Sequence, residues 1–88
     1  MAESANGWFV YILKCGDGTF YTGITTDLKR RLEEHNRGKA SKYTRTRLPV
    51  KMIYRTACRE RSEALIRESA IKSLSRAKKK ELINGKNK

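Results

Sequence analysis

The chain has 88 residues, of which 21 are Lys or Arg and nine are Asp or Glu, giving a formal net charge of +12 at pH 7. A chain of this length suits one compact domain with a modest core, which leaves no room for a separate target-reading domain. The excess of positive charge indicates an acidic polymer as partner, with nucleic acid first, although ribosomal or solubilising charge gives the same composition. Composition does not separate DNA from RNA.

The ends of the chain and the two cysteines carry few signals. Residues 1–7 are expected to be a flexible leader, because they lack the basic start and apolar stretch of a signal peptide. We expect one domain over residues 8–83 and a disordered tail over 84–88. Cys15 and Cys58 lack metal-ligand spacing, and no apolar run has the length of a membrane span, so we expect free thiols, a cytoplasmic location and, by default, a monomer.

Two β-type segments open the domain. Residues 8–14 (WFVYILK) are almost wholly apolar or aromatic, which predicts a central strand covered on both faces. The segment 19–25 (TFYTGIT) resumes the β pattern after Cys15, so the two form a hairpin. A three-residue loop with Gly18 in the left-handed conformation closes it.

That loop fixes the register of the hairpin. It pairs Leu13 with Tyr21 and Tyr11 with Gly23, and the alternation of side chains then places both tyrosines on one face. A loop longer by one residue would place the two tyrosines on opposite faces, so the grouping depends on the turn.

A helix is predicted from an Asp27 N-cap to about residue 37, before Gly38. Its apolar side is defined by Leu28 and Leu32. At 100° per residue, Arg31 and His35 lie along one flank of that side, whereas Arg30 points to solvent. The two adjacent arginines are therefore not equivalent.

The next segment is strongly basic and contains no acidic residue between Glu34 and Glu60. It ends in a third strand over residues 50–56 (VKMIYRT), after Pro49, in which alternate residues make one side polar, as expected of an edge or half-exposed strand. We predict that this segment contacts nucleic-acid phosphates, although a solvated surface is the more ordinary reading of such charge. The predicted contact residues are Lys39, Lys42, Tyr43, Arg45, Arg47 and Arg55.

A second long helix is predicted over residues 60–74, followed by a short one capped by Ser75 and running through Ile83. The inward stripe of the long helix contains Ala64, Leu65 and Ile71, with Glu68 in its middle and Glu63 turned to solvent. A carboxylate on an apolar stripe needs a partner, either a salt bridge to Arg31 or Arg67, or a metal ion. The expected fold is α+β, like a small α/β sandwich: a three-stranded antiparallel sheet flanked by helices in the order ββαβα plus a short C-terminal helix.

These residues resemble the GIY-YIG nucleases, which include bacterial excision-repair incision proteins, phage homing endonucleases and some restriction enzymes. Residues 9–11 (FVY) resemble the Gly-Ile-Tyr motif, 21–23 (YTG) the Tyr-Ile-Gly motif, and 27–35 (DLKRRLEEH) the arginine helix that follows. The resemblance covers residues 8–83 and is greatest to the short stand-alone bacterial subgroup. Phe9 and Thr22 depart from the motifs, but neither position supplies a functional group.

The resemblance implies a Mg²⁺- or Mn²⁺-dependent endonuclease that hydrolyses a phosphodiester bond in DNA, in repair or recombination. By position, Arg31 matches the catalytic arginine, His35 the nearby helix residue and Glu68 the metal-binding glutamate. Tyr11 or Tyr21 would take a proton from water, and Gly23 would keep the pocket open. The alternatives are a nucleic-acid-binding module without catalysis and an interaction domain for a protein or ribosomal partner.

Overall fold

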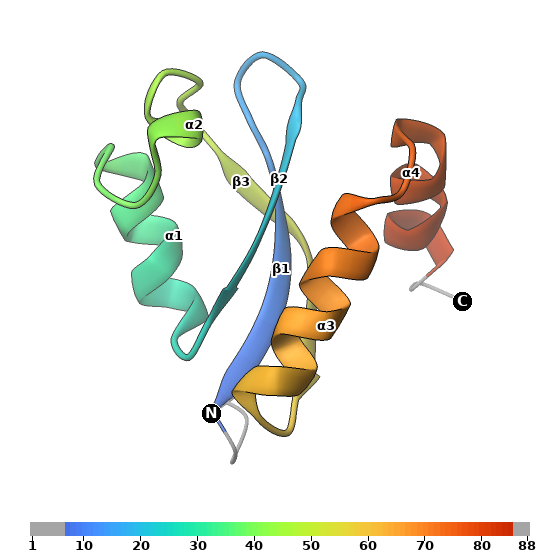
Figure 1. Cartoon of the computed structure of the whole chain (residues 1–88). Helices are drawn as coiled ribbons and strands as arrows, with labels where there is room; N and C mark the ends of the chain where they lie inside the picture. Colours follow the sequence, from blue (N-terminus) through green and yellow to red (C-terminus); the bar gives the residue numbers. More distant parts are fainter. Residues whose placement is uncertain (1–6, 86–88) are drawn as a thin grey trace.

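The computed structural model describes residues 7–85. A three-stranded antiparallel sheet lies between helices, as expected (Figure 1). The elements in chain order are β1 (Trp8–Lys14), β2 (Phe20–Thr25), α1 (Leu28–Asn36), α2 (Lys42–Arg45), β3 (Lys51–Cys58), α3 (Arg61–Lys72) and α4 (Arg76–Gly85). No helix in this part of the chain combines the length and apolar character needed to cross a bilayer.

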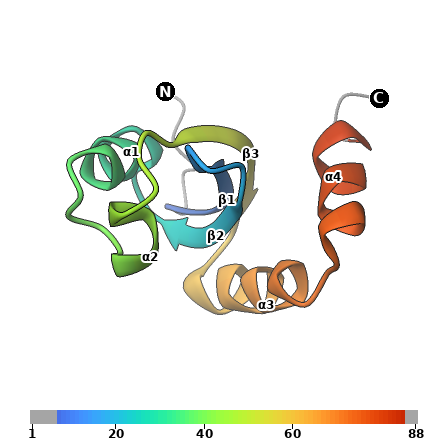
Figure 2. The same ribbon diagram turned by 90° about the horizontal axis from the view of Figure 1, so that it is seen from above.

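Strand β1 is the middle strand of the sheet, in the order β2-β1-β3, so its predicted central position and the edge position of β3 are confirmed. Figure 2 shows α1 and α2 on one side of the sheet and α3 and α4 toward the other. Because side chains alternate along β1, Tyr11 and Leu13 enter one cluster, and Val10 and Ile12 enter the other. The first cluster lies beneath α1, and the second beneath α3.

The hairpin has the predicted register. Tyr11 pairs with Gly23 and Leu13 with Tyr21. The turn closes through a hydrogen bond from Cys15 N to Thr19 O of 2.8 Å, with Gly18 at φ +87°. Glycine adopts that angle without strain, and the three-residue loop keeps both tyrosines on the face that α1 covers.

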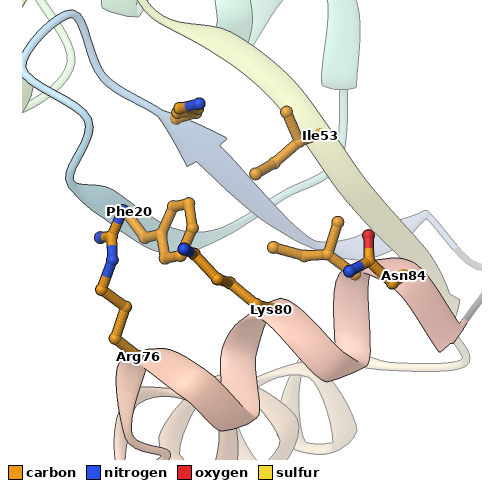
Figure 3. A pocket seen from close by; sticks show the side chains of 7 residues that line it. Phe20, Ile53, Arg76, Lys80 and Asn84 are labelled. Atoms are coloured by element: carbon orange, nitrogen blue, oxygen red, sulfur yellow. The ribbon is translucent and has the colours of Figure 1, made fainter.

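Helix α4 makes its apolar contacts with the sheet layer near its end, where Leu82 and Ile83 pack against the second cluster. Between α4 and the strands lies a cavity, partly lined by Phe20 and Ile53 (Figure 3). Ser75 caps the helix as predicted, since its Oγ accepts a hydrogen bond from Lys78 N at 3.2 Å. The helix continues to Gly85, two residues beyond the predicted boundary, so the tail prediction is wrong for residues 84–85, and 86–88 lie outside the described residues.

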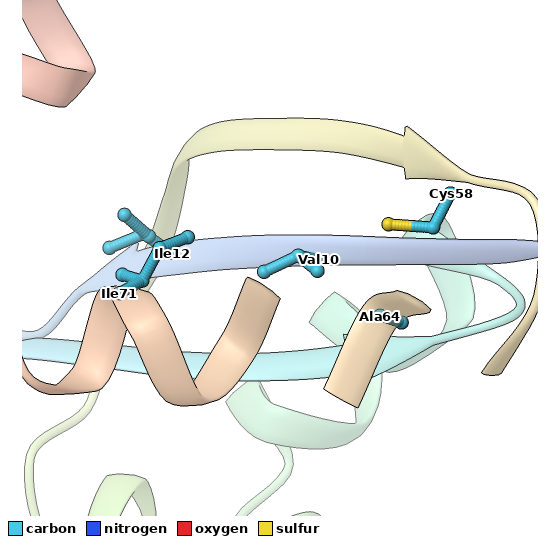
Figure 4. Packing of buried hydrophobic residues seen from close by; sticks show 5 residues of the cluster. All are labelled: Val10, Ile12, Cys58, Ala64 and Ile71. Carbon is cyan, nitrogen blue, oxygen red and sulfur yellow. The ribbon is translucent and has the colours of Figure 1, made fainter. Parts of the chain in front are cut away.

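Beneath α3, the core is built from small and branched side chains. Val10 and Ile12 of β1 are fully buried against Ala64 and Ile71 of α3, with Cys58 beside them (Figure 4). Cys15 and Cys58 are both buried, and neither forms a disulfide within residues 7–85. Leu65 was predicted to point inward, but it is 38% exposed, because α3 rests on the sheet through Ala64 and Ile71.

Two further features differ from the predictions. A β-bulge between Ile12 and Leu13 breaks the alternation of β3, so Met52 joins the α1 cluster while both Ile53 and Tyr54 join the α3 cluster. Helix α2 was not predicted within the basic segment. Ser41 begins it, with its side chain accepting hydrogen bonds from the backbone N–H groups of the next turn.

Candidate active site

The site forms where the two tyrosines of the hairpin meet α1. Tyr11 is 2% exposed and lies over Gly23 of the neighbouring strand. A Cβ on Gly23 would lie 2.6 Å from the Tyr11 hydroxyl and 2.8 Å from Cζ. The absence of a side chain at position 23 therefore leaves room for the Tyr11 phenol above β2.

His35 connects Tyr11 to α2. Its Nε2 lies 2.9 Å from the Tyr11 hydroxyl, and its Nδ1 lies 2.8 Å from Thr44 Oγ1. The Thr44 hydroxyl donates to Ser41 O at 3.4 Å, so it accepts from Nδ1–H. His35 is then the Nδ1–H tautomer, and Tyr11 donates to Nε2.

Burial determines the charge state of this pair. Burial, together with the Arg31 guanidinium, lowers the pKa of His35, against a smaller opposing effect of Glu34. Burial first, then the neighbouring Tyr21, raises the pKa of Tyr11, while Arg31 lowers it. At neutral pH the pair is therefore a neutral phenol bonded to a neutral imidazole. His35 was predicted on a helix flank, but it is 1% exposed.

Tyr21 is the more accessible of the two tyrosines. Its ring meets the edge of His35, with centroids 5.2 Å apart, and stacks on Tyr43 at 5.9 Å. The Arg47 guanidinium covers the Tyr43 ring at 3.9 Å and pairs with Asp17 at 3.1 Å. The stack joins the predicted catalytic tyrosine to the predicted nucleic-acid-binding residues of α2.

Arg31 is incompletely paired. Its Nη1 lies 3.5 Å from Glu34 Oε1, whereas its Nε is buried and has no hydrogen-bond partner. A buried donor without an acceptor is costly, so its retention needs a reason. Arg30, by contrast, is 60% exposed, as the helix period predicted.

Glu68 lies on α3, with a side chain that is 19% exposed. Its carboxylate pairs with Lys72 at 3.3 Å, and neither Arg31 nor Arg67 is its partner, since Arg67 pairs with Glu63. The charge of Glu68 lies close enough to Tyr11 to help raise the pKa of that phenol. Arg31, Tyr21 and Glu68, from three different elements, thus all act on Tyr11.

The other predicted contact residues spread around this site. Lys42 and Arg45 are exposed on α2, Lys39 is exposed just before it, and Arg55 is exposed on β3 opposite Tyr11. The described residues contain no group of three or more His, Cys, Asp or Glu side chains that could hold a metal ion. A metal here would therefore have fewer than three ligands from such side chains.

Sequence reasoning missed two residues that hold the site. Thr44 is fully buried and fixes the His35 tautomer. Asn36 joins α1 to the start of β3, since its amide donates to Val50 O at 3.1 Å and accepts from Val50 N at 2.8 Å. Ser41, a typical N-cap residue three positions earlier, could have indicated the short helix that contains Thr44. No local sequence pattern indicates the role of Asn36.

Residues 7–81 match a family model, the GIY-YIG catalytic domain. The chain belongs to the GIY-YIG family. A domain of this family indicates nuclease activity, with nucleic acid as the class of substrate, and supports an endonuclease. The resemblance seen in the hairpin motifs and the arginine helix is thereby confirmed.

The relatives of this GIY-YIG chain are small stand-alone proteins. It is 55% identical over 82 residues to a UPF0213 protein of Desulfotalea psychrophila, covering 92% of this chain and 74% of the relative. A Streptococcus agalactiae UPF0213 protein is 52% identical, with 81% of each chain covered. Among solved structures, an E. faecalis protein has a TM-score of 0.66 at 41% identity over 98% of this chain and 92% of its own. A UPF0213 protein of Bacillus halodurans has a TM-score of 0.58 at 45% identity, and the match covers 88% of this chain and 82% of that protein.

Proposed function

We propose that the chain is a metal-dependent endonuclease module that hydrolyses a phosphodiester bond in DNA, in repair or recombination. The observation that carries the proposal is that Tyr11 and Tyr21 meet at His35 of α1, the helix that also carries the incompletely paired Arg31. The charge of Glu68 acts on the same Tyr11 phenol. Phosphodiester hydrolysis needs a base for water, a cation on the phosphate and stabilisation of the leaving oxygen. Each requirement has a residue of the matching chemistry.

The two tyrosines take different roles in this proposal. Tyr11 is buried, and its protonated hydroxyl donates a hydrogen bond to His35. It is therefore a positioning residue, and its oxygen can still accept a hydrogen bond. Tyr21 is only partly buried, so its hydroxyl is the better placed to meet a water molecule. Tyr21 would first release its own proton to solvent and then, as the phenolate, take a proton from the attacking water. The water oxygen bonds to phosphorus as the bond from phosphorus to the 3′ oxygen breaks, and the leaving 3′ oxygen takes a proton from solvent.

Arg31 would hold the scissile phosphate. Its guanidinium has only a 3.5 Å contact with Glu34 and an unpartnered Nε, so it can exchange a weak contact for a phosphate oxygen. Hydrogen bonds between Arg and phosphate are charge-assisted and among the strongest in proteins.

Glu68 would hold the divalent ion, Mg²⁺ or Mn²⁺. Mg²⁺ keeps several of its waters and is bound through one or two carboxylates together with substrate phosphates, so a single partly exposed carboxylate fits it. When bound, the ion supplies charge neutralisation for the leaving oxygen. Lys72 pairs with Glu68 and is 55% exposed, so it can turn to solvent and leave the carboxylate to an ion.

The test is cleavage of labelled DNA and RNA structures in Mn²⁺ or Mg²⁺ by the parent, Arg31→Ala and Glu68→Gln proteins. We expect metal-dependent nicking of DNA, with a loss of about 100-fold or more in both variants, as for removal of a transition-state contact. Arg30→Ala, which removes the same charge one residue away on the solvent side, is the matched control and should cleave like the parent.

Equal cleavage by Glu68→Gln and the parent would remove the metal role. Binding that weakens steeply with salt, with no cleavage under either ion, would instead establish the binding-only alternative. RNA cleaved in preference to DNA would correct the substrate.

A further inference from the structure

A second basic site lies on the opposite face of the sheet from Tyr11. It is the cavity of about 320 Å³ between α4 and the strands, and it is open to solvent on one side (Figure 3). Lys14, Phe20 and Ile53 come from the three strands, and Arg76, Lys80, Ile83 and Asn84 come from α4. Phe20, Ile53 and Ile83 belong to the α3 cluster, not to the tyrosine cluster, which separates the cavity from the candidate active site.

The charge around this cavity is of one sign. Lys14, Arg76 and Lys80 line it, and no acidic residue does. Within the part of the chain that the structure describes, these three cations form no ion pair, whereas Lys78 on the same helix pairs with Glu81 at 3.7 Å. Arg76 and Lys80 stand four residues apart on one face of α4, an arrangement that destabilises a helix unless an anion relieves it.

Arg76 is already held in place. Its Nη2 donates to Gly18 O at 2.9 Å, and its guanidinium lies over the Phe20 ring at 4.6 Å. A guanidinium fixed by a stack and one hydrogen bond keeps other N–H groups for a ligand and loses little side-chain entropy on binding. Figure 3 shows Arg76 and Lys80 reaching from α4 toward the strands, with Asn84 further along the same helix.

We propose that this cavity binds a phosphate group carried on a nucleic-acid strand. Three unpaired cations select an anion, and phosphate suits a forked guanidinium. The volume exceeds that of a lone phosphate, and the apolar wall of Phe20, Ile53 and Ile83 offers contact to an attached sugar. The open side lets the strand continue, and the net charge of +12 favours a polyanion over a free ion. The protein therefore has two nucleic-acid surfaces, one on each face of its sheet.

The test is an amide NMR titration of the whole chain in EDTA, so that cleavage plays no part and the outcome is independent of the proposed nuclease activity. A short single-stranded DNA oligonucleotide and inorganic phosphate are added in separate arms. We expect the oligonucleotide to shift the amides of Lys14, Gly18 and Asn84 in a saturable way, at concentrations at which inorganic phosphate does not. The amide of Tyr43 reports binding at the other face in the same spectra.

Lys80→Ala and Lys78→Ala form a matched pair, because each removes one lysine from α4 but only Lys80 lines the cavity. Lys80→Ala should weaken the binding read at Lys14 and Gly18, lower its salt slope by about 0.7, as for one phosphate contact of a single strand, and leave the Tyr43 curve unchanged. Lys78→Ala should bind like the parent.

Three outcomes would overturn the proposal. The first is a Tyr43 shift without any shift at the cavity amides. The second is an equal loss of oligonucleotide affinity in Lys80→Ala and Lys78→Ala, which would mean that the DNA is attracted by the overall positive charge and not by this cavity. The third is saturation by inorganic phosphate at the oligonucleotide's concentration, which would make the ligand a free anion.

Discussion

Replacing Gly23 with alanine tests the contact between the hairpin strands on which the candidate site rests. The added Cβ would lie 2.6 Å from the Tyr11 hydroxyl and 2.8 Å from Cζ, closer than such atoms can approach. Tyr11 cannot move away freely, since it is 2% exposed and bonded to His35. Overpacking of this kind destabilises by about 1–3 kcal/mol. A strand glycine without that contact would instead gain about 0.5–1 kcal/mol from alanine.

The assay is thermal unfolding followed by circular dichroism, for Gly23→Ala alone and in a Tyr11→Leu background that removes the ring. In the parent background, each kcal/mol of lost unfolding free energy should lower Tm by about 4–8 °C for a domain of this size. In the Tyr11→Leu background the same change should be neutral or stabilising, which gives a coupling between the two positions of about 1 kcal/mol or more. An equal cost in both backgrounds would show that the phenol does not occupy the space above Gly23.

Two further predictions concern the hydrogen bonds of His35. Thr44→Val keeps the shape but leaves the buried Nδ1–H without an acceptor, so urea unfolding should show a loss of about 1–3 kcal/mol, against less than about 0.5 kcal/mol for Thr46→Val on the surface. The pKa of His35 is lowered in the folded state, so at mildly acidic pH the unfolded chain binds more protons than the folded one. The contribution of neutral His35 to the free energy of unfolding is therefore complete above the ordinary pKa of 6.5 and is lost as pH falls below it. His35→Gln should flatten that slope between about pH 5 and pH 7, and an unchanged slope would assign it to other groups.

The sequence predicted the parts of the fold that local rules decide. The three-residue loop and Gly18 fixed the hairpin register, and Asp27 capped α1 as expected, its side chain accepting from Arg30 N at 3.0 Å. The helix period placed Arg30 outside and Arg31 against the fold. In these cases the deciding interaction spans only a few residues, so the pattern contains the answer.

The misses all required contacts between distant segments. His35 is buried because α2 closes over it, and α2 itself was hidden in a basic segment whose only helix signal was Ser41. The bulge in β3 arises because β1 pairs with Tyr54 and then with Met52, which leaves Ile53 without a partner in the ladder, and no local pattern predicts this shift. Leu65 lies on the apolar side by periodicity but is exposed, since the small Ala64 takes the contact with the sheet.

The edge position of β2 bears on how charges from both sides of the sheet act on Tyr11. Tyr11 belongs to the layer beneath α1, whereas Glu68 belongs to α3 on the other side, and a continuous sheet would keep their charges apart. Tyr11 instead reaches across Gly23 toward the edge, and the Glu68 charge acts on it there. Because β2 is an edge strand with a glycine opposite the phenol, no side chain at position 23 covers the Tyr11 hydroxyl. A side chain at position 23 should therefore impair cleavage even in a variant whose stability has been restored by substitutions elsewhere.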